Sequence, residues 1–504
     1  MAGIGWRLER LIDGGVSGAA AAYATGAAVM TLPWVLTTTV LMSLSALIGS
    51  GRPDFAPAGV VVNTAFAVAM LVSGPIQIVT SRYVADRMYE RRMRAIAAPF
   101  CRGLGATFVL CAVPAGAACI ALGLPPRDAL WGAALSAAVG AQWTALSVGN
   151  GLCAPTLVLG AVGAGAALSF VAAALLATVA GLGVPGYAFG LLAGQVLSLV
   201  ILLVGILRAL PQVSDESARL APAFRDYALL AAAGLAFNAA LWVDKLVAWG
   251  WVGGRTAALH AAASTLAWFS TIPCLAWVFV ELETTFHRRF RDFFRHLEGG
   301  ATLAEVRRGV GRLGREVRRL LRGALSVQFG VTVFLELSAE RWTHWVGLPA
   351  EALPHCRFLL VAAGALALGL LGQILLYYLD LRREAFAGAA GMLAGVAALS
   401  AVAARIGLPP SAGTALGCTL GAALTWRHVF RGVARVVENT LLGQPFGVGH
   451  GETRSLPRAE LVHEHQPRRE RALAVRARDG RTPEVHAARN RRIAQGQHVA
   501  TRGK

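Results

Sequence analysis

Charged residues are scarce in this 504-residue chain, since Asp, Glu, Lys and Arg together make up only 15% of the sequence. Soluble domains carry about 25% of such residues. Hydrophobic residues make up 56%, and the mean hydropathy is positive. This composition excludes a soluble protein of this length and predicts a membrane protein.

The sequence also lacks the motifs of catalytic and metal sites. Its seven cysteines form no CxxC pair, and they are expected to be packing residues of apolar segments. Clustered carboxylates, metal-ligand spacing and nucleophile motifs are missing. The run GVGRLG at Gly309 to Gly314 matches the GxGxxG pattern of dinucleotide-binding sites. That pattern requires a preceding strand, and none is expected here, so the match is interpreted as chance. We therefore expect a protein that is not an enzyme, without cofactor or metal, and transport is favoured by elimination.

Long apolar runs are abundant in the first 440 residues. About 20 such residues form a helix that crosses the hydrocarbon core, and a lipid-exposed backbone must bond within its own helix. We expect an all-α polytopic membrane protein of about twelve transmembrane helices, at residues 20–49, 57–82, 99–123, 127–147, 155–180, 185–209, 225–250, 259–284, 320–338, 355–379, 384–404 and 410–432.

The arginines indicate orientation, because positive charges that flank spans stay in the cytoplasm. They gather after the second and the eighth span, and both termini are therefore predicted to be cytoplasmic. A cleaved signal peptide is an alternative at the N-terminus, but the apolar run continues as far as Ile48. The candidate docking residues for a cytoplasmic partner are Arg87, Arg91, Arg92, Arg288, Arg289 and Arg291.

The two basic segments also indicate an internal repeat. GPIQIVTSRYVADRMYERR ends the second span and TIPCLAWVFVELETTFHRRFRDFF ends the eighth, each with a proline before an aromatic, arginine-rich exit. We expect two parallel six-helix lobes around a central cavity. The parts are an N-terminal lobe at 1–210, a cytoplasmic linker at 211–224, a C-terminal lobe at 225–440 with a long basic loop at 285–319, and a disordered basic tail at 441–504.

The net charge of +19 needs no nucleic-acid partner, because cytoplasmic arginines and the tail account for most of it. The arginines around Gly309 to Gly314 favour an amphipathic helix at the membrane surface or against a partner. The tail is interpreted as a solvated cytoplasmic segment, with contact to anionic lipid or nucleic acid as the alternative.

Lysine is nearly absent, occurring only at Lys245 and Lys504, and Lys245 lies inside a span next to Asp244. Neighbouring residues of a helix point about 100° apart, so we expect these two not to face each other and each to find its partner elsewhere. Trp242 and Trp249 are placed to pack on the lysine stem. Two interpretations stay open: a charged pair along the substrate path, and an anchor at the interface or a structural ion pair.

Other polar residues at membrane depth extend the list of substrate-path candidates, although each can also serve as hydrogen-bonding glue between helices. These candidates are Asn238, Gln142, Gln195, Gln328 and Gln373, in addition to Trp242, Asp244 and Lys245. Pro33 and Pro75 interrupt the first two spans and are candidate hinges, or ordinary kinks.

Taken as a set, MAGIGWRLERL at the N-terminus, the exits of the second and eighth spans, and WVDKLVAW at 242–249 resemble the Pel exopolysaccharide transporter family (PelG), over residues 1 to about 440. The resemblance implies the multidrug, oligosaccharidyl-lipid and polysaccharide flippase superfamily, and export of a galactosamine-type polymer across the bacterial inner membrane. It also implies two kinds of partner, a cytoplasmic glycosyltransferase and regulatory Pel membrane subunits.

The sequence leaves three functions open. The protein is a Pel-type polysaccharide exporter, a cation-coupled drug exporter or lipid-linked oligosaccharide flippase of the same fold, or a non-transporting scaffold for the synthase.

Overall fold

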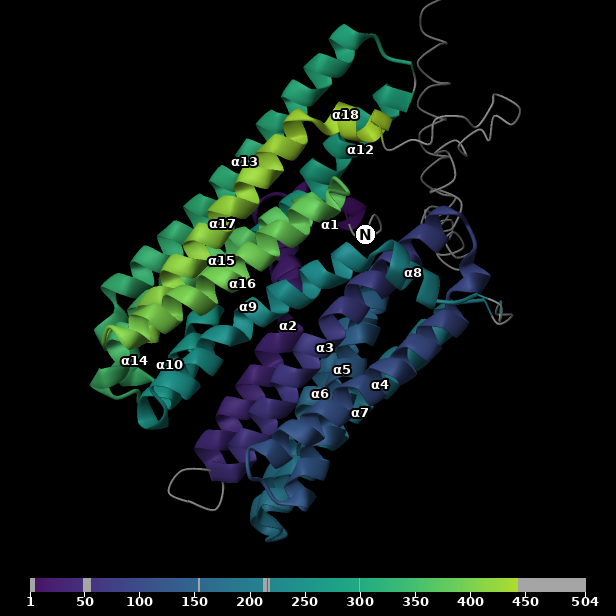
Figure 1. Ribbon diagram of the computed structural model, residues 1–504. Coiled ribbons are helices and arrows are strands. Elements are labelled where there is room, and N and C mark those ends of the chain that lie inside the picture. The colour runs from purple at the N-terminus through teal and green to yellow at the C-terminus, as the bar shows by residue number, and fades with distance from the viewer. Residues whose placement is uncertain are drawn as a thin grey trace, which may run out of the picture. The chain divides into compact units, whose positions relative to one another are not determined.

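The computed structural model describes residues 5–48, 56–152, 155–211, 215, 218–298 and 300–442, and these residues form helices and no strand (Figure 1). The expected all-α polytopic membrane protein is confirmed. The chain divides into two units, 1–439 and 440–504, and the description below concerns the first. Cys153 and the predicted tail, apart from the end of the last helix, lie outside the described residues.

The α-helices run in the following order: α1 Gly5–Ile12, α2 Val16–Ile48, α3 Ala56–Tyr89, α4 Ala97–Ala121, α5 Pro126–Gly151, α6 Pro155–Ala174, α7 Gly183–Ala209, α8 Ala221–Asp226, α9 Ala228–Trp251, α10 Gly254–Phe269, α11 Ile272–Glu281, α12 His287–Glu298, α13 Leu303–Leu337, α14 Ala339–Trp345, α15 Leu353–Tyr378, α16 Arg382–Arg405, α17 Pro410–Ala434 and α18 Val436–Leu442. Short π-helices, η3 (Leu175–Val179) and η4 (Leu282–Phe286), follow α6 and α11.

Ten helical segments in the described part of the chain are long and apolar enough to cross a membrane. The two other predicted spans, 127–147 and 410–432, coincide with α5 and α17. These helices have 26 and 25 residues, enough to span, but they fall outside the set of ten. More than half of their residues are buried among other helices, where small and polar side chains replace lipid-facing ones. The count of twelve spans stays a prediction.

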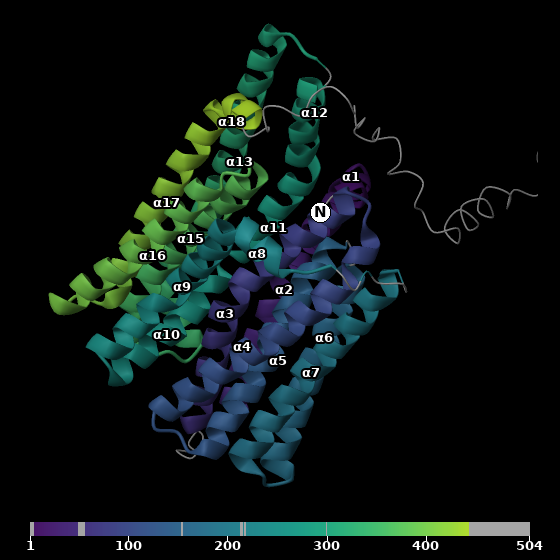
Figure 2. The ribbon, with the colours of Figure 1, turned by 45° about the vertical axis from the view of Figure 1, so that its right-hand side comes forward.

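The long helices pack in two groups, an N-terminal group (α2–α7) and a C-terminal group (α9–α17), which Figures 1 and 2 show in purple to blue and in teal to yellow. The largest cluster of buried hydrophobic residues comes only from residues 233–436, and two others come only from residues 44–210. The groups touch where α2 packs on α11 and α3 packs on α9. This packing is compatible with the predicted lobes, whose boundaries stay a prediction.

Close packing of the last helix in each group rests on glycines four residues apart. In the N-terminal group, Gly186, Gly190 and Gly194 of α7 lie against α6 and η3; in the C-terminal group, Gly413, Gly417 and Gly421 of α17 lie against α16. A Cβ atom at Gly190 would lie 2.2 Å from the backbone nitrogen of Ala173, and one at Gly413 would lie 2.1 Å from the carbonyl oxygen of Leu399. Only a glycine permits such an approach, so the same packing device recurs in both groups.

The basic segment predicted as a loop at 285–319 is mostly helical, as the amphipathic interpretation of its arginines expected. It comprises the end of η4, α12 and the first half of α13. Thr302 caps α13, with its hydroxyl accepting from the backbone N–H of Glu305. Arg289 of α12 pairs with Glu316 of α13 at 3.3 Å, which joins the two helices.

Candidate functional site

A tight turn between α9 and α10 builds the charged site. Gly253 and Gly254 both have positive φ, 65° and 51°, which reverses the chain within a few residues. Residues at equal distances from this turn then lie at the same level of the two helices. Asp244 lies seven residues before the end of α9 and His260 lies six residues after the start of α10, so α10 brings His260 opposite Asp244.

Asp244 is the centre of a buried three-residue cluster. One carboxylate oxygen, Oδ2, lies 2.9 Å from His260 Nε2, and the other, Oδ1, lies 3.1 Å from Lys245 Nζ. Asp244 is 2% exposed and His260 is fully buried. The expectation that Asp244 and Lys245 do not face each other is therefore wrong, because the flexible lysine stem folds back along α9 and overcomes the angle between the two Cα–Cβ directions.

The direction of the lysine argues against an interface anchor. Lys245 Nζ donates to the carbonyl oxygen of Leu241, 2.8 Å away and one turn toward the N-terminal end of α9. It also lies 5.8 Å from the centre of the Trp242 ring, as expected. A snorkelling lysine would extend the other way, toward Trp251, about 9 Å along the helix. Trp249, the other expected ring, is 62% exposed.

The polar cluster continues across the C-terminal group. The rings of His260 and His355 meet edge to face, with centroids 5.7 Å apart, and His355 Nδ1 lies 3.2 Å from the hydroxyl of Ser411. These side-chain contacts connect α9 to α10, α10 to α15, and α15 to α17. The two imidazoles touch through their rings, while the polar bonds of the cluster are those of His260 to Asp244 and of His355 to Ser411.

A small cavity of about 20 Å³ adjoins this cluster. Its lining includes Asp244, Lys245, Ser264, Thr414 and Cys418, so polar groups and apolar residues share the wall. A cavity of this size holds about one water molecule. The charged pair therefore lies beside a space that admits water and excludes a sugar.

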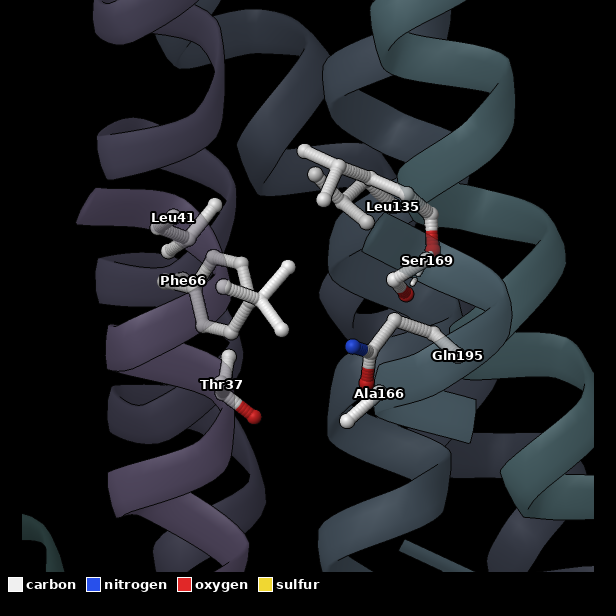
Figure 3. A pocket seen from close by; sticks show the side chains of 9 residues that line it. Thr37, Leu41, Phe66, Leu135, Ala166, Ser169 and Gln195 are labelled. Atoms are coloured by element: carbon white, nitrogen blue, oxygen red, sulfur yellow. Dashed lines mark hydrogen bonds between the residues drawn. The ribbon is translucent and has the colours of Figure 1, made fainter. Parts of the chain in front are cut away.

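A second cavity, of about 10 Å³, lies in the N-terminal group. In Figure 3, Thr37, Leu41 and Phe66 face Ser169 and Gln195 across it. Every residue of this lining is uncharged. Gln195 is thus the substrate-path candidate that lines a cavity in this group.

Most other polar candidates bond neighbouring helices. Gln142 Nε2 donates to Ser198 on α7, Asn238 Nδ2 donates to the carbonyl oxygen of Met70 on α3, and Gln373 Nε2 donates to the carbonyl oxygen of Ala385 on α16, at distances of 2.8, 2.9 and 3.1 Å. Gln328 bonds Thr332 in its own helix at 3.2 Å. The first three contacts are of the kind expected for hydrogen bonds between helices, whereas that of Gln328 is not, and a role of these residues in the substrate path stays a prediction.

The candidate hinges lie inside unbroken helices: α2 continues through Pro33 and α3 continues through Pro75.

Among the candidate docking arginines, several already bind this chain. Arg87 pairs with Glu90 at 2.8 Å, Arg92 approaches Glu90 at 3.9 Å, Arg288 pairs with Glu9 at 3.4 Å, and Arg289 pairs with Glu316. Arg91 ends α3 with a positive φ of 59°. Within the described part of the chain, neither Arg91 nor Arg291 makes an ion pair, so these two are the most available of the set.

Sequence reasoning missed His260 and His355. Each is a lone histidine inside an apolar segment, and that pattern was the signal available.

Comparison with known proteins places the chain among transporters. The family model described as "PelG: Putative exopolysaccharide Exporter (EPS-E)" matches residues 1–439. No curated protein gives a significant match.

Similar solved structures include a MATE variant with TM-score 0.63 and 14% identity, covering 83% of this chain and 96% of that one. A variant of the Vibrio cholerae MATE transporter VcmN has TM-score 0.62 and 15% identity, covering 84% and 100%. An outward-facing multidrug resistance MATE family transporter of the MOP superfamily has TM-score 0.60 and 15% identity, covering 83% and 96%. At these identities the likeness shows the fold, which is that of a membrane transporter.

Proposed function

Because the chain belongs to the PelG family, we propose that it exports a Pel-type, galactosamine-containing exopolysaccharide across the bacterial inner membrane, with both termini in the cytoplasm. The observation that carries this proposal is the family match over residues 1–439, which covers both helical groups. The MATE-like fold supports it, because two packed groups of helices offer a route along the surface between them.

The route requires the two groups to move apart. The two cavities described above, of about 10 and 20 Å³, hold about one water molecule each, whereas ligand pockets have volumes of about 300–1,000 Å³. The contacts between the groups include single hydrogen bonds, such as Asn238 to Met70 and Tyr227 to Asp86. Each such bond contributes about 1 kcal/mol, but α2 also packs on α11 and α3 on α9, so admitting a growing polymer requires these helices to separate as well.

The charged cluster supplies a specific interaction for this cargo. A free amino group of galactosamine is a compact ammonium, as is the side chain of Lys245. Once the helices around the cavity of about 20 Å³ move apart, this amino group can take the place of Lys245 beside Asp244 while His260 continues to orient the carboxylate. In this proposal Asp244 is a binding residue for the amino sugar and Lys245 is its resident competitor.

The test is complementation of a Pel-producing strain that lacks its own transporter, with this chain expressed together with its cognate partners. Surface polymer is measured with an N-acetylgalactosamine-binding lectin, at matched membrane abundance. Restored polymer is the expected result. Lack of polymer with an active synthase, together with lowered accumulation of a cationic dye, would instead assign the chain to multidrug export, which the MATE structures make the second candidate.

Coupling to a cytoplasmic glycosyltransferase is part of the same proposal. Substitution of Arg291 tests this coupling most directly. Arg291→Glu should weaken co-purification of the synthase several-fold without loosening α12. Arg289→Glu is the comparison, because it also breaks the pair with Glu316 and should loosen α12, an effect that Glu316→Arg should reverse. Unchanged recovery of the synthase with Arg291→Glu contradicts docking at α12.

A further inference from the structure

One face of α13 carries a stripe of arginines that the proposed export route does not use. Arg315, the neighbours Arg318 and Arg319, and Arg322 follow one another at steps of three or four residues, so they lie along one side of the helix, and Ser326 continues the stripe. All five are exposed. The opposite side of α13 packs in the C-terminal core through residues such as Leu320.

These side chains line an open cavity of about 530 Å³, and α11 supplies its other wall through Trp277. Gly323 makes that wall possible, since a Cβ there would lie 2.2 Å from the indole ring of Trp277. Beneath two of the arginines lie Gly311 and Gly314, where an added Cβ would be 3.8 and 3.7 Å from the guanidinium groups of Arg315 and Arg318. Arg315 and Arg318 therefore lie back along the helix over Gly311 and Gly314, at distances that an added methyl group would also allow.

The cavity has an excess of positive charge. Arg319 is held by Glu281 at 2.6 Å and by Glu316 at 3.3 Å. For Arg315, Arg318 and Arg322, the described residues provide no carboxylate within 4.0 Å. Guanidinium groups this close together repel one another, and an anion between them relieves the repulsion.

The depth of the cavity favours a lipid over a soluble ligand. The apolar part of α13, expected at 320–338, begins beside Arg319. Ser326 lies about 9 Å farther along the helix, inside the apolar part. Arginines at the edge of a span lie at the level of lipid headgroups, and an indole ring such as that of Trp277 is favoured at the same level. An acidic protein segment would have to place its backbone against hydrocarbon to reach Ser326.

We propose that this cavity binds the phosphate-bearing headgroup of an anionic lipid. Arg315, Arg318 and Arg322 hold the phosphate through paired N–H donors, Trp277 packs against the glycerol region, and Ser326 marks where the acyl chains begin. The site lies on α11 and α13, next to the contact between α11 and α2, so the bound lipid lies against a surface where the two helical groups meet.

The experiment is lipid titration of the full chain in detergent, followed by native mass spectrometry, with phosphatidylglycerol and phosphatidylcholine as probes. Wild-type protein should retain phosphatidylglycerol and not phosphatidylcholine. The triple variant Arg315→Gln, Arg318→Gln and Arg322→Gln should bind phosphatidylglycerol on the order of a hundredfold more weakly, given about fivefold per arginine. Arg307→Gln, Arg308→Gln and Arg312→Gln, which remove the same charge from the same helix outside the cavity lining, should bind as wild type does.

Two further variants keep the test decisive if the triple variant fails to fold. Ser326→Phe fills the cavity from an exposed position, keeps every charge, and should also abolish retention of the lipid. The triple variant Arg315→Lys, Arg318→Lys and Arg322→Lys, which keeps the charge, should preserve most of the lipid retention. Equal binding by the triple variant and the wild type overturns the proposal. Displacement of the lipid by an equal concentration of inorganic phosphate, or of an acidic peptide, would likewise overturn it, by assigning the cavity to a soluble anion.

Discussion

Replacing Asp244 by asparagine tests the charged cluster most directly. The substitution keeps the size of the side chain and removes the negative charge that faces both Lys245 and His260. The ammonium of Lys245 then keeps only the carbonyl oxygen of Leu241, 2.8 Å away, and the ring of Trp242. A cation left in this position without its counter-ion destabilises the folded state.

The magnitude follows from burial. Removing one partner of a fully buried ion pair costs about 3–5 kcal/mol. The Lys245 side chain is 20% exposed, which allows some hydration, so we expect a loss of about 3 kcal/mol in the free energy of unfolding for Asp244→Asn. Lys245→Met should lose about 2 kcal/mol, because Asp244 retains His260. The double variant should lose about 2–3 kcal/mol, which is less than the sum of the two single losses.

The assay is unfolding of the purified variants in mixed micelles by a denaturing detergent, with Ser264→Ala as an uncharged control from the same cavity. Secreted polymer is measured in parallel at matched membrane abundance. Losses that simply add in the double variant would refute the ion pair. If the double variant folds and exports polymer normally at matched membrane abundance, the ion pair is structural. The proposed role of Asp244 in binding the amino sugar is then wrong.

Two other predictions concern the contact between the helical groups. Tyr227→Phe removes the hydroxyl that donates to Asp86 of α3 and should destabilise that contact by about 1 kcal/mol. The loss should be seen as faster amide exchange in α8. The same substitution at Tyr89, which is exposed, should have no effect. Gly74→Ala places a Cβ 2.0 Å from Asn238 Nδ2, so the amide should turn away and lose its hydrogen bond to the carbonyl oxygen of Met70. This loss should weaken the contact between α3 and α9 by about 1 kcal/mol, seen as faster amide exchange there, and unchanged exchange would contradict the packing.

The sequence predicted the fold well because hydrophobic length is a local property. Each of the ten helices that are long and apolar enough to cross a membrane coincides with an apolar run predicted from the sequence. The family resemblance was confirmed by the match over residues 1–439. The helices α5 and α17 show where this signal weakens. They lie among other helices, so lipid does not require their surfaces to be apolar, and glycine, serine and threonine take over.

The site was predictable only in part because its geometry depends on contacts between helices. The rarity of lysine singled out Lys245 and, with it, Asp244. The partnership with His260 depends on the turn at Gly253 and Gly254, and helix period alone does not reveal it. The helical period also led to the wrong prediction that Asp244 and Lys245 do not face each other. The period fixes the direction of each Cβ atom but not the path of the four-carbon lysine side chain.

The two helical groups repeat their packing but not their chemistry. Both close their last helix with glycines four residues apart, yet the cavity near Gln195 has an uncharged lining, whereas the cavity of the C-terminal group contains Asp244 and Lys245. A symmetric transport cycle would place equivalent charges in both groups. If Asp244 binds the amino sugar as proposed, this asymmetry places recognition of its charge in the C-terminal group, and uncharged substitutions at Gln195 should affect export less than removal of Asp244.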